Sequence, residues 1–311
     1  MTHLDEGTSA GYAIGVVTRH TGLSPDVLRV WERRYGVVTP TRSAGGQRLY
    51  SATDIEKLRL LRRLVDGGHR IASIARLDHE ALAALSREIE VTPAAAADTS
   101  ASEHDIASLL DATASLDGAA IEGTLRRAAL SLGAQTWVDT IVAPFLHQVG
   151  DRWHDGTLTP AHEHLATAGV REVLAWVVKS FGVAPDAPSI LVATPAGELH
   201  ELGAMMAAVI ASGAGWRVHY LGPNVPAANL AEAARQLEVA ALALSVVHSD
   251  HAAGSVAEVK LLRGSLPATV AIIVGGTAAN AAASEFTRAG ARIAGDTMAF
   301  RAELADIMPV D

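Results

Sequence analysis

The chain of 311 residues contains no cysteine, only 4% aromatic residues and no long uninterrupted apolar run. Without cysteine there is neither a disulfide framework nor a thiolate metal site, and a reducing cytoplasm is the simplest setting. A membrane span needs about 18 or more apolar residues in succession, so no membrane attachment is expected. The opening stretch MTHLDEGTSAGY lacks a basic segment followed by an apolar one, so no secretory signal is expected either. The length of 311 residues predicts about two domains or three small ones, and the hydrophobic content of 49% indicates a globular protein.

Basic residues are also scarce, but they are concentrated. The whole chain has 25 Lys and Arg against 34 Asp and Glu, a net charge of −9. Residues 11–76 hold 12 of the basic and 5 of the acidic residues, or +7, which leaves 13 against 29, or −16, for the remainder. A compact basic module on an acidic body predicts a polyanionic partner for that module alone.

Within the basic module, two short helices are predicted on either side of the turn TGLS. Ser24 is a suitable N-cap and Pro25 a suitable first residue for a second helix that continues to about Tyr35. Two helices joined in this way form a helix-turn-helix. The second helix is expected to expose three arginines: Arg29, Arg33 and Arg34.

A hairpin follows, with Gly45 and Gly46 at its turn and Arg42 and Arg48 on its flanks. The stretch from Ile14 to Leu77, with RVWERRYG and the pattern P.R…G.R.Y, resembles the winged-helix DNA-binding domain of the MerR family. This resemblance implies double-stranded operator DNA as the partner. The three helix arginines would meet the major groove or its phosphates, and Arg42, Arg48 and Tyr50 would serve the wing.

The middle of the chain is predicted to be helical. Residues 91–102, VTPAAAADTSAS, have few large apolar side chains and are typical of a linker. Helical patterns with short connections follow and favour an antiparallel four-helix bundle; they cover residues 103–116, 118–132, 134–152 and 160–181. The expected domains are a DNA-binding domain at 1–90, the linker, the bundle at 103–184 and a last domain at 185–311.

The third connection of the bundle, RWHDGTLTPAHEH, is rich in histidine. Trp153 and His154 close the third helix, and Glu163 and His164 fall in the opening turns of the fourth, so both pairs lie at one end of the bundle. Trp153 could still be a core aromatic, and Glu163 could favour the helix dipole. A capping box would want an acid at position 162, which is His162. Neighbouring histidines in HEH point to different helix faces, which speaks against a metal site.

From residue 188 onward, buried β-rich runs alternate with helical stretches, which predicts a doubly wound parallel α/β sheet. Ligands of such sheets bind outside the carboxyl ends of the strands. His200 follows the first strand, Ser245 ends the third, and Gly275 and Gly276 end the fourth, so all lie on one rim. Glu198 is near enough to hold one nitrogen of His200 and leave the other for a metal.

The motif ELHELG, then SVV, then GG resembles the cobalamin-binding pattern DxHxxG…SxL…GG of corrinoid proteins, with Glu198 in place of Asp and Val247 in place of Leu. HELGA does not complete the zinc-protease pattern HExxH, because residue 204 is Ala. The resemblance implies a Rossmann-like cobalamin-binding domain with His200 as the lower axial cobalt ligand. A groove bounded by Gly203, Ser245 and Gly275 would take the nucleotide tail.

Trp153 followed by Glu163-His164 matches the W-x9-EH signature of the CarH/LitR group of MerR-type, adenosylcobalamin-dependent light sensors. This resemblance implies a repressor, not an enzyme, that adenosylcobalamin assembles into an operator-bound tetramer in darkness and that light disassembles. Trp153 would cover the adenosyl group, Glu163 and His164 would bind it, and His154 would become the upper cobalt ligand after photolysis. Two alternatives remain: a corrinoid enzyme component, and a MerR-type regulator that works without cobalamin or light.

Overall fold

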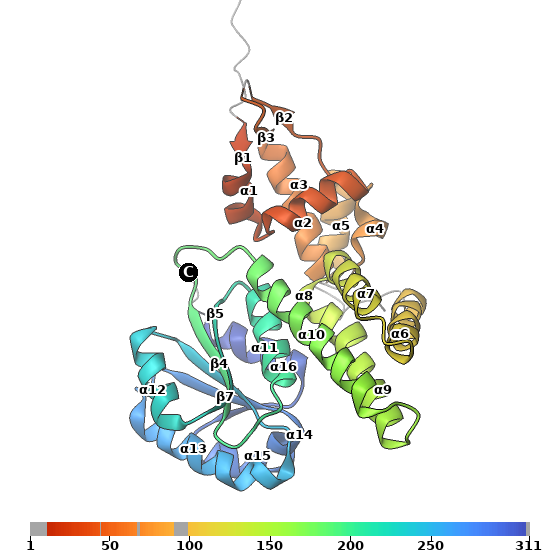
Figure 1. Cartoon of the computed structure of the whole chain (residues 1–311). Helices are drawn as coiled ribbons and strands as arrows, with labels where there is room; N and C mark the ends of the chain where they lie inside the picture. Colours follow the sequence, from red (N-terminus) through yellow and green to blue (C-terminus); the bar gives the residue numbers. More distant parts are fainter. Residues whose placement is uncertain (1–10, 44, 67–68, 90–98, 309–311) are drawn as a thin grey trace, which may run out of the picture.

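The computed structural model describes residues 11–43, 45–66, 69–89 and 99–308 (Figure 1). Its first part is a winged helix-turn-helix, as predicted, with a three-stranded antiparallel sheet in the order β1-β3-β2. The elements are β1 Tyr12–Ala13, α1 Ile14–Thr21, α2 Pro25–Val30, a π-helical turn η1 Trp31–Tyr35, β2 Thr41–Arg42, β3 Arg48–Tyr50, α3 Ala52–Asp66, α4 Ile71–Ile74 and α5 His79–Ile89.

Local chemistry explains the helix-turn-helix. Gly22 ends α1 at φ 68°, a left-handed conformation that a residue with a side chain adopts only at a cost. The Ser24 hydroxyl then caps α2 by accepting from the Val27 N–H at 3.1 Å. Leu28 and Trp31 of the same helix are buried. The predicted helix from Pro25 to Tyr35 is confirmed, except that its last five residues widen into a π-helical turn.

The middle part is the predicted four-helix bundle. It comprises α6 Thr99–Ala114, α7 Gly118–Ser131, a third helix made of α8 Ala134–Trp137, η2 Val138–Val142 and α9 Ala143–His154, and α10 Pro160–Ser180. The third helix widens at η2 because Pro144 has no N–H to give to the preceding turn. Helix α6 begins four residues earlier than expected, so residues 99–102 of the predicted linker are helical. The rest of that linker lies outside the described residues.

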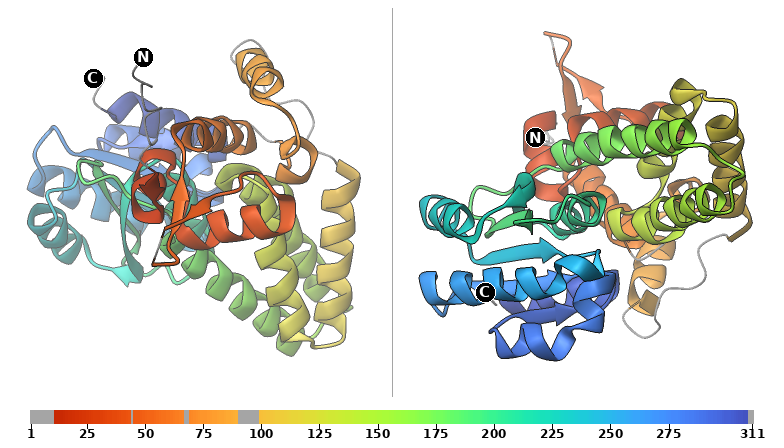
Figure 2. Two further views of the ribbon diagram at one scale, coloured as in Figure 1. Left: turned by 90° about the horizontal axis from the view of Figure 1, so that it is seen from above. Right: turned by 60° about the horizontal axis from the view of Figure 1, so that its bottom comes forward.

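The last part is a parallel five-stranded sheet in the order β5-β4-β6-β7-β8. Helices α11 and α16, together with the bundle, share the core on one face, and α12, α13 and α15 cover the other (Figures 1 and 2). The strands are β4 Ser189–Pro195, β5 Arg217–Val225, β6 Ala241–Ser245, β7 Ala271–Gly275 and β8 Arg292–Ala294. The helices are α11 Leu202–Gly213, α12 Ala227–Gln236, a 3-10 turn η3 Ser249–His251, α13 Ala252–Ser265, α14 Thr277–Ala281, α15 Ala283–Arg288 and α16 Thr297–Ile307.

The strand order places a switch point between β4 and β6. The chain leaves β4 for α11 on one face of the sheet and leaves β6 for α13 on the other. The loops after these two strands, residues 196–201 and 246–251, therefore diverge and frame the crevice in which ligands of doubly wound sheets bind. No helix in the described part of the chain is long and apolar enough to cross a bilayer.

The DNA-binding domain rests on the other two parts. The Trp31 indole N–H donates to the Leu130 carbonyl of α7 at 3.0 Å, and Arg62 of α3 donates to the Gly213 carbonyl at the end of α11 at 2.9 Å. A cavity of about 50 Å³ lies at this joint, with Trp137 of the bundle in its wall. Gly213 is the last residue of α11, and the first residue of that helix, Leu202, lies beside the crevice.

Candidate ligand site and nucleic-acid interface

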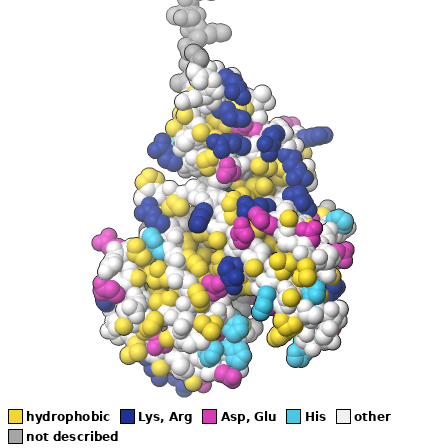
Figure 3. Space-filling model, viewed as in Figure 1, with side chains coloured by type: hydrophobic (Ala, Val, Ile, Leu, Met, Phe, Trp, Pro, Cys, Tyr) yellow, Lys and Arg dark blue, Asp and Glu magenta, His cyan; other side chains and the backbone are white. Residues whose placement is uncertain are grey.

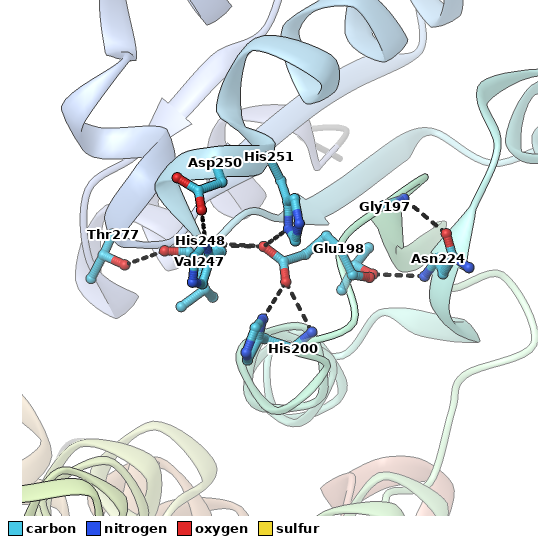
Figure 4. Close-up of polar contacts among 10 residues, drawn as sticks. Gly197, Glu198, His200, Asn224, Val247, His248, Asp250, His251 and Thr277 are labelled. Atoms are coloured by element: carbon cyan, nitrogen blue, oxygen red, sulfur yellow. Dashed lines mark hydrogen bonds and ion pairs between the residues drawn. The ribbon is translucent and has the colours of Figure 1, made fainter. Parts of the chain in front are cut away.

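One buried carboxylate organises the crevice. Glu198 lies in the loop after β4 with its side chain fully buried (Figure 4). Its Oε1 accepts from the backbone N–H of His200 at 2.9 Å and from the His200 ring Nδ1 at 2.6 Å. Its Oε2 accepts from the backbone N–H groups of Val247 and His248, both at 3.0 Å. Glu198 thus joins the loop after β4 to the loop after β6.

The charge of Glu198 is stabilised by these donors. Burial alone would raise the pKa of its carboxyl group, but the N–H groups of His248, His200 and Val247 and the His200 ring outweigh burial and lower the pKa to about 2. The group is therefore an anion that is fully paired with donors.

The tautomer of His200 follows from this pairing. An ionised carboxylate only accepts hydrogen bonds, so Nδ1 must carry a proton, and Nε2 is the nitrogen left to bind a metal. The His200 side chain is 57% exposed although its partner is buried. A neutral imidazole that is held at Nδ1 and presents Nε2 to the surface is suited to bind a metal. In the described residues no group of three or more His, Asp and Glu forms a metal centre by itself.

The rest of the His200 loop is also anchored. Asn224 of β5 accepts from the Gly197 N–H at 2.8 Å and donates its own N–H to the Glu198 carbonyl at 3.1 Å. Glu201, the next residue after His200, accepts from Arg171 of α10 at 2.6 Å and from the Tyr220 hydroxyl of β5 at 2.7 Å. This Arg171–Glu201–Tyr220 clamp ties the bundle to the sheet beside His200.

We expect Glu198→Ala to destabilise the protein before any ligand is added. Three backbone N–H groups lose their acceptor, and such losses cost about 1–3 kcal/mol each before relaxation. The free energy of unfolding, measured in urea, should fall by about 2–4 kcal/mol. The exposed Glu232→Ala on α12 is the control and should change it by less than about 0.5 kcal/mol. Equal effects of the two variants would show that Glu198 does not organise the loops.

The second candidate cluster lies at one end of the bundle. Trp153 and His154 end α9, and a short turn leads to α10, on which Glu163 bonds the His164 ring at 2.7 Å. Trp153 is 50% exposed, so the interpretation as a core aromatic is wrong. His164 is 79% exposed and His154 is exposed as well. The end of the bundle therefore presents an aromatic face and polar groups that are not used by the core.

Helix α10 begins with a capping box that the sequence did not predict. A capping box is present although position 162 is not acidic, because the His162 ring Nδ1 accepts from the Thr159 N–H at 3.1 Å. His162 is thereby engaged in holding the helix start. Glu163 takes no part in the capping box and contacts the His164 ring instead.

The two clusters lie at the amino-terminal ends of neighbouring helices, α10 and α11. Helices α10 and α11 run in the same direction, since Phe181 beyond the end of α10 lies against Gly213 at the end of α11, and Arg171 meets Glu201 at its start. Glu163 and His164 precede Arg171 by seven or eight residues, which is about 10–12 Å of helix. They therefore project beyond the rim that holds His200. Figure 3 shows a notch between the two lobes of the molecule, with histidine side chains on both sides.

The glycines of the rim allow close packing. A Cβ atom on Gly203 would lie 2.5 Å from the Ser245 hydroxyl, and one on Gly276, at φ 104°, would lie 2.4 Å from the Val246 carbonyl. A Cβ atom on Gly275 would lie 3.2 Å from the Ala294 carbonyl, which is also tight. Gly276, with its positive φ and its backbone neighbours, is the position that requires glycine. The structure thus brings the predicted rim residues together on adjacent strands β6 and β7 and the start of α11.

The predicted DNA-contacting residues divide into two groups. Four arginines are exposed on the outer surface of the winged domain: Arg29, Arg33, Arg34 and Arg42. Figure 3 shows Lys and Arg side chains gathered over this part. Arg48, by contrast, is only partly exposed and is paired with Glu32 at 3.0 Å; Arg29 is also paired, with Asp26 at 3.0 Å, but stays exposed. Tyr50 is fully buried and donates its hydroxyl to Glu32. Tyr50 thus serves the wing by holding β3 to η1 and presents no exposed surface to DNA.

Several residues near the site were missed. His248 and His251 follow β6 on the rim, and the rule that singled out Ser245 would have found them. The Arg171–Glu201 contact joins two domains, and no signal in the sequence pairs these residues.

Three family models match the chain. Residues 12–80 match the MerR HTH family regulatory protein, and residues 106–177 and 188–305 match two models described as B12 binding domain. A monomethylamine corrinoid protein from Methanosarcina barkeri has a similar fold, with a TM-score of 0.51 at 18% identity over 64% of this chain and 96% of that chain. The fold and its motifs thus define a transcription regulator of the MerR type with B12-binding domains.

Curated relatives specify the family. The chain is 34% identical to the HTH-type transcriptional repressor CarH of Myxococcus xanthus, over 86% of this chain and 89% of the relative. It is 30% identical to the repressor CarA of the same organism, over 76% of each chain. The chain belongs to the CarH family of MerR-type transcriptional repressors. The predicted fold class and family are confirmed.

Proposed function

We propose that the protein is a light-responsive repressor of the cytoplasm that binds operator DNA in darkness as an adenosylcobalamin-assembled tetramer and releases it on illumination. The observation that carries this proposal is the His200 imidazole, held at Nδ1 by Glu198 beneath the projecting end of the bundle. The same chain carries an arginine-rich winged helix and is related to CarH over most of its length.

The residues present fit the cofactor. His200 would bind cobalt from below through Nε2, and Gly203, Ser245, Gly275 and Gly276 would line the path of the nucleotide tail. Adenosylcobalamin, when bound, supplies a cobalt–carbon bond that visible light breaks. Trp153 offers its exposed indole face as a cover for the adenosyl group, and Glu163 and His164 offer hydrogen bonds to it. His154, next to Trp153, is the candidate for an upper ligand after illumination.

The switch requires a difference in affinity. A ligand shifts an equilibrium only if it binds one state better than the other, so adenosylcobalamin must favour the assembled form. The adenosyl group would contact the end of the bundle, whereas His200 would hold cobalt from the sheet domain. Its loss would remove the link between the two parts except for fixed contacts such as Arg171–Glu201. Movement of the bundle relative to the sheet then alters the surfaces that form the tetramer.

DNA binding should depend on the exposed arginines. We expect Arg33→Ala to weaken operator binding roughly 10-fold and to reduce the slope of log affinity against log salt by about 1, because one phosphate contact is lost. Cobalamin uptake should not change. Fluorescence anisotropy with operator DNA over a range of salt concentrations measures both quantities.

Arg48→Ala is the matched comparison, since Arg48 is paired with Glu32. It should lower affinity with a smaller change in slope. An unaltered salt slope in Arg33→Ala would place the DNA surface elsewhere.

A further inference from the structure

A second imidazole lies against His200. His248, in the loop after β6, has its ring stacked on the His200 ring, with centroids 5.6 Å apart and planes inclined by 15°. The His251 ring also lies near His248, with centroids 5.3 Å apart and a tilt of 39°. Three imidazoles from two loops therefore gather around Glu198 in the crevice.

The stacking is built into the backbone. The carboxylate that holds the His200 ring also accepts the backbone N–H of His248, so both residues are registered by Glu198. Thr277, the first residue of α14, holds the same loop, because its hydroxyl donates to the Val247 carbonyl at 2.9 Å. The Asp250 carboxylate lies 3.7 Å from His248 Nδ1. The backbone that carries the His248 ring is thus held by contacts that do not involve a ligand.

One hydrogen bond does not fix a ring. Glu198 holds His200 at Nδ1, but the imidazole can still swing about that bond, and the His200 side chain is 57% exposed. A flat neighbour on one face removes this freedom. Ordering a side chain on binding costs about 0.5–1.5 kcal/mol, which corresponds to about 2- to 10-fold in affinity.

We propose that His248 is a positioning residue for the lower cobalt ligand: its ring face holds the His200 imidazole so that Nε2 points out of the crevice before the corrinoid arrives. The inference rests on cobalamin binding by His200, as proposed above. His248 acts through the face of its ring and not through its nitrogens, so a benzene ring at this position should serve as well.

The test uses the full chain in darkness, titrated with adenosylcobalamin and followed by the visible absorbance that reports the axial ligand. His248→Ala should raise the dissociation constant about 3- to 10-fold. His248→Phe should restore it to within about 2-fold of the wild type. The exposed His104→Ala on α6 is the control and should bind like the wild type. Thermal unfolding of the ligand-free variants should be unchanged.

A ligand-free readout accompanies this titration. The ¹⁵N signals of the His200 ring should shift and broaden in His248→Ala but not in His104→Ala, because only the former removes the neighbouring ring. Wild-type binding in His248→Ala, or binding by His248→Phe as weak as that of His248→Ala, overturns the inference and leaves the proposed function standing. A wild-type protein that binds no cobalamin, with unchanged His200 signals in His248→Ala, defeats both.

Discussion

His200→Ala is expected to weaken adenosylcobalamin binding by at least about 100-fold, since even residues that only support a metal ligand contribute about 10- to 100-fold. The imidazole-dependent bands of the visible spectrum should disappear. The fold should survive, because the His200 side chain is mostly exposed and the loop stays anchored by Glu198, Glu201 and Asn224. Equilibrium dialysis and the absorbance spectrum measure the effect.

The control for this variant is His104→Ala, an exposed histidine on α6. It should bind with wild-type affinity and spectrum. If His200→Ala binds adenosylcobalamin as tightly as the wild type, with the same spectrum, then His200 is not the ligand, and the interpretation of the crevice is wrong.

Trp153→Ala is expected to bind the corrinoid but fail to form the dark tetramer. The indole is 50% exposed at the bundle end, so its removal leaves the core intact while taking away the face proposed to cover the adenosyl group. The affinity difference between assembled and dissociated states then shrinks, and the assembled fraction falls with it. Each loss of about 1.4 kcal/mol from that difference reduces the assembly constant about 10-fold.

Light scattering coupled to size exclusion, in darkness, measures this effect. Wild type with methylcobalamin should resemble Trp153→Ala with adenosylcobalamin, because both lack the contact between indole and adenosyl group. Trp153→Phe should retain part of the assembly. A full tetramer from Trp153→Ala would contradict the proposed role of the bundle end.

Most of the fold could be predicted because it depends on local signals. Ser24 and Pro25 start a helix by capping chemistry, and the helix begins where expected. The alternation of buried strands and helices after residue 188 predicts a parallel sheet, since inner strands such as β4 and β6 are buried on both faces. The π-helical turn before Pro144 was missed, although a proline within a helical pattern indicates an irregularity.

The site was predictable only in part. The rim position of His200 follows from its place after a strand, and its pairing with Glu198 follows from their spacing. The second carboxylate oxygen of Glu198 bonds residues 49 and 50 positions away, which the sequence cannot show. The burial of Tyr50 could not be predicted for a related reason, because its partner Glu32 lies on another element.

Whether light releases the adenosylcobalamin-assembled protein from DNA is decided by measuring operator binding of the wild type before and after illumination. One sample is divided, and its absorbance, mass and affinity for operator DNA are measured in darkness and again after visible light. We expect a tetramer that binds operator DNA tightly in darkness, and a smaller species with weakened DNA binding once the spectrum has changed. A light-induced change of spectrum with unchanged mass and unchanged DNA affinity would contradict it.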